Sequence, residues 1–191
     1  MTTIRLAQEP AADELLSTDP FALLTGMLLD QQVPMEKAFA GPRVIADRLG
    51  LATLDPRAVA DADPEEFAKV MTGPPAVHRY PQSMGTRVQA LAAAIVEQYG
   101  GDTEALWRDV ATGAELYDRL KALPGYGPQK AKIFVALLGK QVGVRPAGWK
   151  AAAGDYGLAG YRSVADVTDP ASLIKVRDFK KAAKAAAKAA K

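Results

Sequence analysis

The segment that decides the fold reads ELYDRLKALPGYGPQKAKIFVALLGK, from Glu115 to Lys140. A helix ending at Leu123 meets a short turn that contains two glycines, and Pro128 is placed to begin a second helix. Apolar residues recur with helical spacing on one face of this second helix: Ala131, Phe134, Val135 and Leu138. The segment therefore predicts two helices joined by a tight hairpin at 123–128.

The hairpin has the features of an anion-binding site. Gly125 and Gly127 permit backbone conformations closed to other residues and let the main chain approach a ligand. The free amides at the start of the second helix, reinforced by the helix dipole, would bind an anion there. The surrounding stretch 119–154 carries seven basic residues and no acidic one, with Lys130 and Lys132 directly behind the turn. Phosphate is the ligand this pattern favours, and a chance run on a solvated face is the alternative.

Helix-start signals occur along the whole chain and alternating strand patterns do not, which predicts an all-α protein. Asp-Pro pairs at 19–20, 55–56 and 63–64 each place a side-chain acceptor at a helix N-cap and proline at the first helical position. Thr112 and Glu115 have the spacing of a capping box. We expect helices at 20–31, 34–49 with an interruption at Gly41-Pro42, 56–71, 86–99, 103–110, 114–122, 128–140 and 146–153, and an ordered loop at 72–83.

The composition narrows the class of protein. With 191 residues, 49% of them hydrophobic and 24% charged, the chain is long enough to bury a core of ordinary size. Cysteine is absent, which excludes disulfide scaffolds, thiolate zinc sites and iron–sulfur clusters. A single histidine makes other metal centres improbable as well, so we expect neither a metal nor a cofactor. No apolar stretch has the length of a membrane span, and we expect a cytoplasmic protein.

The charge of the chain is unevenly distributed. Residues 175–191 carry seven basic side chains and one acidic one, a net charge of +6, whereas residues 1–174 carry 17 basic and 21 acidic ones, a net charge of −4. The end of the chain, FKKAAKAAAKAAK, is low in complexity and has a high helix propensity. Its alanine face has too little bulk to hold a core, so we expect a tail that frays until an anion such as a phosphate backbone orders it. A solubilising role is the alternative.

The turn LPGYGPQKA at 123–131 resembles the L-P-G-x-G signature of the helix-hairpin-helix superfamily of base-excision DNA glycosylases. The helix region 87–102 is similar to the family's helix leading to that hairpin, and PFALL with LLDQQV at 20–33 is similar to its early helix. The resemblance covers about residues 20–155. It implies a two-lobed, all-helical glycosylase-like domain over 18–165, with 1–17 packed on it and 175–191 as a basic tail.

The resemblance also implies a mode of DNA binding. The hairpin would hold the DNA backbone while a damaged base is rotated into the cleft between the lobes. Gln31 or Gln32 would fill the space left in the duplex, unless both are simply polar residues exposed at a helix end. The residues expected to contact DNA are Gly125, Tyr126, Gly127, Gln129, Lys130, Lys132, Gln31 and Gln32 and, on the tail, Lys181, Lys184 and Lys188. Tyr126 and Trp149 are candidates for stacking on the base, although aromatic residues near helix starts are commonly core residues.

The chain departs from the family pattern at both catalytic positions. The lysine that forms a Schiff base in bifunctional members corresponds to Gln129, whose amide cannot act as that nucleophile. Lys130 should point about 100° away around the helix. The family's carboxylate corresponds to Ala147. Neither standard catalytic residue is present at its expected position.

Three other ionisable residues are candidates for the chemistry. Asp30, next to Gln31, would face the cleft or cap the following turn. His78 could carry a proton near neutral pH, or it could be a hydrogen-bonded packing residue. Asp155, which ends the stretch without acids, could reach the cleft.

Two functions are compatible with these observations. The first is a monofunctional DNA glycosylase, which hydrolyses the N-glycosidic bond of a damaged or mismatched base without a lyase step. The second is a catalytically inactive protein that recognises damaged DNA, which would account directly for Gln129 and Ala147. In both cases the partner is double-stranded DNA, and we expect a monomer associated with the nucleoid.

Overall fold

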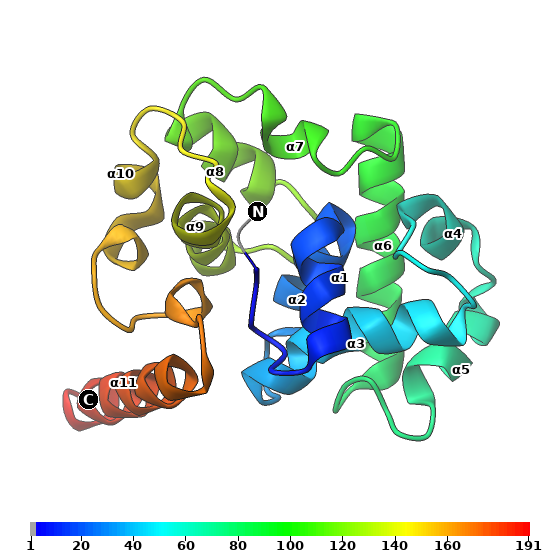
Figure 1. Cartoon of the computed structure of the whole chain (residues 1–191), viewed down its shortest axis with the longest axis horizontal. Helices are drawn as coiled ribbons and strands as arrows, with labels where there is room; N and C mark the ends of the chain where they lie inside the picture. The colour runs from blue at the N-terminus through cyan, green and yellow to red at the C-terminus, as the bar shows by residue number, and fades with distance from the viewer. Residues whose placement is uncertain (1–2) are drawn as a thin grey trace.

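The structure is a computed structural model that describes residues 3–191, and all regular elements in this range are helical (Figure 1). The predicted all-α class is confirmed, since the described residues contain no strand and a single isolated bridge, between Thr112 and Ala147. The α-helices are α1 (Pro10–Thr18), α2 (Pro20–Leu29), α3 (Met35–Arg48), α4 (Pro56–Asp61), α5 (Pro64–Thr72), α6 (Pro81–Tyr99), α7 (Ala105–Arg108), α8 (Gly113–Lys121), α9 (Pro128–Leu137), α10 (Trp149–Ala153) and α11 (Pro170–Ala189). Three short turns complete them, namely the π-helical η1 (Leu138–Val142) and the 3₁₀ turns η2 (Gly154–Gly157) and η3 (Val164–Asp166).

Contacts between the helices fall into two sets (Figure 1). In the first set α1, α2 and α3 pack together, and α6 packs against α2, α4 and α5. In the second set α8, α9 and α10 pack against one another, and the turns η1, η2 and η3 surround α9. One continuous cluster of buried apolar side chains runs through both sets. The N-terminal segment joins this core through Ile4 and Leu6, while residues 1–2 of the predicted 1–17 segment lie outside the described residues.

The predicted helix starts are confirmed by their caps. Asp19 accepts hydrogen bonds from the amides of Phe21 (2.9 Å) and Ala22 (3.0 Å) at the start of α2, and Asp55 and Asp63 cap α4 and α5 in the same way. Asp19 also accepts from the amide of Leu54 at 2.6 Å, which ties α2 to the loop before α4. These carboxylates satisfy amides that the first turn of a helix leaves free, which explains why the helices begin at these prolines.

A second predicted cap differs in detail from the expected capping box. Thr112 accepts from the amide of Glu115 at 3.1 Å, as the spacing predicts. The carboxylate of Glu115, however, accepts from the amide of Ala111 at 3.1 Å, one residue before the expected partner. The start of α8 is therefore capped by the predicted pair of side chains, with the reciprocal bond shifted by one residue.

Several predicted helices have different limits. The helix predicted at 86–99 begins earlier, because Pro81 occupies its first turn, so that residues 81–83 of the predicted loop are helical. The predicted interruption at Gly41-Pro42 is wrong, because α3 runs through both residues. Gly41 packs so closely on Leu29 that an added Cβ would lie 2.7 Å from its Cδ1 atom, and burial of this face outweighs the cost of about 3 kcal/mol for a proline inside a helix. The predicted helix 56–71 is divided, since Asp63 starts a new helix. The predicted helix 128–140 continues from α9 into the wider turn η1.

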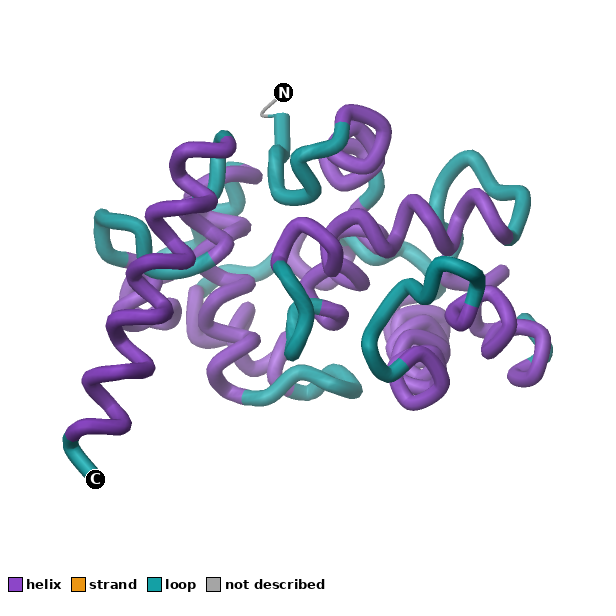
Figure 2. Tube along the Cα trace, turned by 90° about the horizontal axis from the view of Figure 1, so that it is seen from below, coloured by secondary structure: helices purple, strands orange, loops and turns teal. Residues whose placement is uncertain are grey.

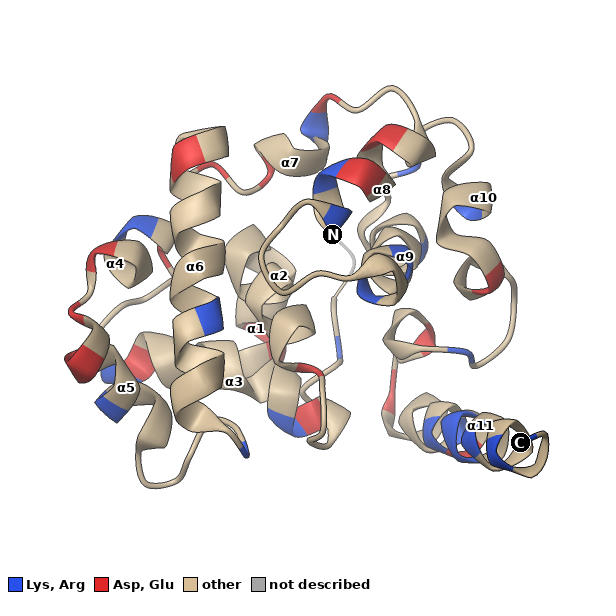
Figure 3. Ribbon diagram, turned by 180° about the vertical axis from the view of Figure 1, so that it is seen from behind, with Lys and Arg blue, Asp and Glu red and all other residues tan. Residues whose placement is uncertain are grey.

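The Lys/Ala segment was expected to fray, and in the structure it forms the second half of the 20-residue helix α11. The first half of this helix is anchored, because Asp169 and Ser172 form a capping box and Leu173 and Val176 are buried. The second half extends beyond the rest of the fold (Figure 2) and carries a dense row of lysines (Figure 3). The anchored turns supply the nucleus that an alanine-rich segment alone lacks. Within residues 3–191, neither α11 nor any other helix is long and apolar enough to cross a membrane.

Candidate functional site

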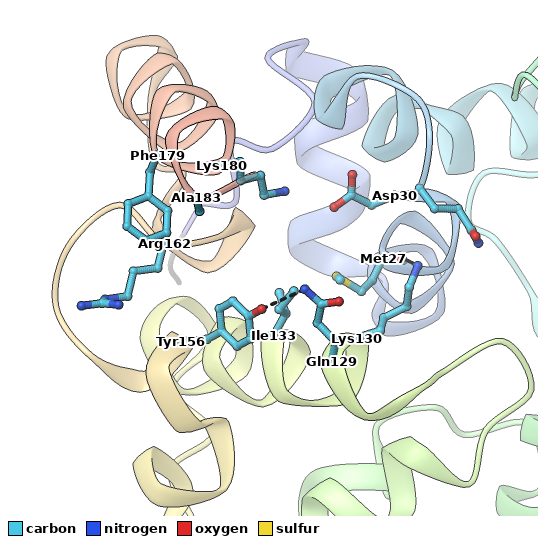
Figure 4. Close-up of a pocket in the computed structure, with 11 residues that line it drawn as sticks. Met27, Asp30, Gln129, Lys130, Ile133, Tyr156, Arg162, Phe179, Lys180 and Ala183 are labelled. Atoms are coloured by element: carbon cyan, nitrogen blue, oxygen red, sulfur yellow. Dashed lines mark hydrogen bonds between the residues drawn. The ribbon is translucent and has the colours of Figure 1, made fainter. Parts of the chain in front are cut away.

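A cavity of about 480 Å³ lies between the end of α2, the start of α9 and one face of α11 (Figure 4). Its volume is in the range of pockets that hold small ligands. The lining combines apolar, amide and charged side chains: Met27, Asp30, Gln31, Gln129, Lys130, Ile133, Tyr156, Arg162, Phe179, Lys180 and Ala183. We call this cavity the cleft. Three cations and one carboxylate line it, so its charge favours an anionic ligand.

The glycine hairpin is held against α2. Gly125 has a φ of +81°, and a Cβ atom there would lie 2.3 Å from Cδ1 of Leu28. Next to it, the hydroxyl of Tyr126 donates a hydrogen bond of 2.6 Å to the carbonyl oxygen of Leu24. Position 125 thus requires glycine for two reasons, its left-handed conformation and its close approach to α2.

The N-terminus of α9 is open. Gly127 is the N-cap residue and is exposed, and a Cβ atom added to it would meet no other atom within 4 Å. No side chain caps this end, and no acidic residue lies in the first turn. Because Pro128 has no N–H, the amides of Gln129 and Lys130 are the donors of this turn. This end of α9 has the chemistry predicted for an anion site.

Tyr126 is a core residue, which corrects its prediction as a residue that stacks on a base. Its side chain is only 5% exposed and packs edge-on against Phe134, with ring centroids 6.1 Å apart. Burial raises the pKa of its hydroxyl well above 10. The ring therefore fastens the hairpin to the core and is not available to a ligand in this conformation.

Lys130 reaches the end of α2. Its Nζ atom donates to the carbonyl oxygens of Met27 (2.7 Å) and Leu28 (2.9 Å). The carbonyl of Met27 also accepts from the C-cap amide of Asp30 at 3.3 Å, and that of Leu28 from the side chain of Gln31, and a cation is favourable at such a helix C-terminus. Burial lowers the pKa of Lys130 to about 8, against the opposing effect of the Asp30 carboxylate. The amine of Lys130 thus joins the two sets of helices, and the residue also lines the cleft, while its contact with DNA stays a prediction.

We expect the stability of the protein to increase with pH between about 8 and 10.5 through Lys130. Because the folded state holds the pKa near 8 and the ordinary value is 10.5, the unfolded chain binds more protons in this interval, and the free energy of unfolding rises with pH. In Lys130→Met this contribution is absent. Urea unfolding of both proteins over this pH range measures the difference between their free energies of unfolding. Contributions of other titrating groups, such as Tyr126, are the same in both proteins and cancel in this difference. A difference that does not change with pH would contradict the prediction.

Asp30 lies in the cleft, as one of its two predicted positions requires. It follows the last residue of α2, and its side chain points across the cleft toward Lys180 (Figure 4). Burial raises its pKa above the usual 3.8, and the charges of Lys180 and Lys130 partly oppose this rise. Among residues 3–191 no side chain or backbone amide donates a hydrogen bond to its carboxylate. Asp30 is therefore the carboxylate placed to act on a ligand in the cleft.

His78 is a structural residue, which corrects its prediction as a catalytic one. Its Nδ1 atom accepts from the amide of Tyr80 at 3.0 Å, so that its Nε2–H donates to the carbonyl oxygen of Gln31 at 2.9 Å. The residue is 1% exposed, and burial lowers its pKa below the usual 6.5. Both ring nitrogens are thus occupied, and the ring positions the backbone next to Asp30.

The remaining aromatic and acidic candidates lie outside the cleft. Asp155 is exposed at η2 and does not line the cavity, so it does not take the predicted catalytic position. Trp149 lies flat against Gly139, where an added Cβ would be 2.4 Å from its ring. It lines a different surface cavity together with Arg145 and Lys150. Trp149 is thus not part of the cleft lining, and its stacking on a base stays a prediction.

Two of the three glutamines predicted to contact DNA, Gln31 and Gln129, line the cleft, and Gln32 is not part of its lining. Gln129 donates from Nε2 to the hydroxyl of Tyr156 at 2.9 Å (Figure 4). Gln31 lines the cleft and folds back onto α2, donating to the carbonyl oxygen of Leu28 at 3.2 Å. Gln32 is exposed and has a φ of +56°, an unfavourable conformation for a residue with a Cβ atom. Insertion of either glutamine into a duplex stays a prediction.

The predicted basic contacts differ in their distance from the cleft. Lys132 is exposed on α9, and Lys181, Lys184 and Lys188 are exposed on α11, all outside the cleft lining. Lys180 is the one lysine of α11 that lines the cleft, because it lies on the side of this helix that faces α2 and α9 (Figure 4). The contacts of the four exposed lysines with DNA stay predictions.

Seven residues of the cleft lining were not predicted from the sequence. Three are aliphatic, namely Met27, Ile133 and Ala183, and the four with aromatic or charged side chains are Tyr156, Arg162, Phe179 and Lys180. Tyr156 lies in the short 3₁₀ turn η2 and Arg162 in a loop, and such short segments have no apolar periodicity that would reveal their position. Phe179 and Lys180 were visible as part of the basic tail, and Phe179 is the one large apolar residue of FKKAAKAAAKAAK. That phenylalanine was the available signal that this end of the tail touches the body.

Comparison of the chain with protein-family models, with curated proteins and with solved structures finds no match.

Proposed function

We propose that the chain binds duplex DNA containing a damaged or mismatched base and hydrolyses the N-glycosidic bond of that base. In this proposal the two sets of helices are the lobes of a helix-hairpin-helix glycosylase-like domain over 18–165, acting on nucleoid DNA in the cytoplasm. The observation that carries the proposal is the position of Asp30. Its carboxylate lines the same cleft as the first turn of α9, which follows the glycine hairpin.

Each part of the cleft has a role in this reaction. The open amides of the hairpin bind a backbone phosphate next to the target nucleotide. The base leaves the stack, at a cost of a few kcal/mol that is lowest for damaged or mismatched pairs, and enters the cleft. The carboxylate of Asp30 then stabilises the positive charge that develops on the sugar or takes a proton from the attacking water. Its burial strengthens both effects.

A Schiff-base step is absent from this proposal. Gln129 has no amine, and the amine of Lys130 is held by two carbonyl oxygens of α2. The reaction ends with a free base and an intact strand that carries an abasic site.

Incubation with duplexes that carry uracil, alkylated or oxidised bases tests the proposal. We expect release of a free base from at least one of them, measured by chromatography. Strand cleavage without heat or alkali should be absent, and borohydride should trap no covalent adduct. A broad panel without any base release would refute the hydrolase, and a trapped adduct would refute the monofunctional mechanism.

The second candidate is a damaged-DNA-binding protein without catalytic activity. The side chains at the two expected catalytic positions favour it, since Gln129 hydrogen-bonds Tyr156 and Ala147 lies outside the cleft. The same panel separates the two functions, because preferential binding of a damaged duplex with no base release identifies the binding protein.

A further inference from the structure

Two cations of the cleft have no acidic partner among residues 3–191. Arg162 makes a side-chain hydrogen bond to the carbonyl oxygen of Ala159 (3.3 Å), and its nearest carboxylate in sequence, Asp166, is occupied by Lys140 at 2.6 Å. Lys180 contacts the sulfur of Met35 at 3.6 Å, which is a weak acceptor. The acid next to Met35, Glu36, pairs with Arg177. Lys180 is therefore directed into the cleft, opposite the Asp30 carboxylate but without an ion pair to it among the described residues.

Aromatic rings lie beside these cations. The guanidinium of Arg162 lies over the ring of Phe179, 5.7 Å from its centroid, and points away from Lys180 (Figure 4). Phe179 keeps 41% of its surface exposed although it adjoins the body of the protein. Tyr156 lines the same cavity below it. An exposed aromatic ring next to unpaired cations is the combination that binds a nucleotide, since the ring supports the base or sugar and the cations bind the phosphate.

We propose that Lys180 forms a phosphate subsite for a single nucleotide held in the cleft, beside the Phe179 ring that Arg162 covers on one side, so that the basic helix α11 is one wall of the binding site. This inference rests on the proposed function, because it assumes that the nucleotide comes from a DNA duplex. It assigns Lys180 a role different from that of the exposed lysines farther along α11. Those lysines meet any DNA backbone, whereas Lys180 meets the phosphate of a nucleotide that has left the stack.

Fluorescence anisotropy with two duplexes of one sequence tests the subsite, one undamaged and one with a tetrahydrofuran abasic-site analogue, whose nucleotide is free of base pairing. Lys180→Ala should weaken binding of the analogue duplex about tenfold, the effect of one charge-assisted hydrogen bond, and reduce the slope of log K against log salt by about 1. Binding of the undamaged duplex should change less than about twofold. Arg162→Ala should act in the same direction. Lys188→Ala, on the same helix but outside the cleft, is the matched control and should weaken both duplexes alike.

Equal effects of Lys180→Ala and Lys188→Ala on the two duplexes would overturn the subsite while leaving DNA binding intact. If the unaltered protein binds neither duplex, the proposed function fails, and a nuclear magnetic resonance titration with a 2′-deoxynucleoside 5′-monophosphate decides the subsite independently. Shifts of the amides of Gly127, Gln129, Lys130 and residues 179–183 that are lost in Lys180→Ala would support it, and the absence of such shifts would overturn it. Alanine is the best helix former, so the variant should remain folded, which circular dichroism checks.

Discussion

Asp30→Asn is expected to lower the rate of base release by about 10² to 10⁴, the contribution of a positioned general base or acid. The substitution removes the only carboxylate among the residues that line the cleft and keeps its size. Single-turnover release of base from a duplex that the protein processes measures the effect. Because the described residues offer the Asp30 carboxylate no hydrogen bond, the free energy of unfolding should change little, and DNA binding should be retained.

Asp155→Asn is the matched control, since Asp155 is an exposed aspartate outside the cleft, and its rate should equal that of the unaltered protein. The pH profile supplies a second check. Since burial raises the pKa of Asp30, activity that needs the carboxylate should be lost on acidification at a pH above 3.8. A catalytic carboxylate predicts a loss of at least about 100-fold in Asp30→Asn. If this variant releases base within a factor of about three of the unaltered rate, Asp30 is not a catalytic residue.

Gly127→Val is expected to weaken duplex binding by about 10- to 100-fold without unfolding the protein. The side chain of valine at the helix N-cap would stand between the phosphate and the amides of the first turn of α9, and loss of such charge-assisted bonds costs about 1.5–3 kcal/mol. The backbone accepts the substitution, because φ is −88° and ψ is 179° and a Cβ atom has open space. Anisotropy measures the binding, and urea unfolding measures the stability.

The other glycine of the hairpin, Gly125, should affect the stability of the protein when it is replaced. Gly125→Ala should destabilise the protein by more than the cost of about 1–2 kcal/mol of a left-handed residue, because its Cβ atom also meets Leu28 at 2.3 Å. Gly50→Ala is the matched control, since Gly50 has a φ of +70° and nothing within 4 Å of an added Cβ. Unchanged duplex binding by Gly127→Val would remove the hairpin from the DNA interface and with it the main support for the proposed function.

Local features of the fold could be predicted because they depend on residues close in sequence. Asp19, Asp55 and Asp63 start helices because a carboxylate and the following proline act within one turn. The buried face of α9 follows from the spacing of its apolar residues. The missed helix α1 also begins with a proline, but its N-cap residue, Glu9, makes no side-chain cap, so the usual signal was absent.

The site could be predicted only in part, because the same side chain can serve a ligand or the core depending on what packs against it. Asp30 in the cleft and the open turn at Gly127 were among the predicted possibilities. The sequence could not show that Tyr126 is buried, or that Lys130 bonds to carbonyls more than a hundred residues away.

By itself the sequence determined the all-α class, the starts of α2, α4 and α5 and the glycine turn between α8 and α9, since backbone preferences and hydrogen bonds within one or two turns decide these features. Only the tertiary structure decided what meets in the cleft. The end of α2, the start of α9 and α11 are far apart in the chain, and burial of Leu173 and Val176 is what places Phe179 and Lys180 opposite Asp30. Burial of apolar surface depends on shape rather than on sequence distance, and it therefore brought together residues that no local pattern connects.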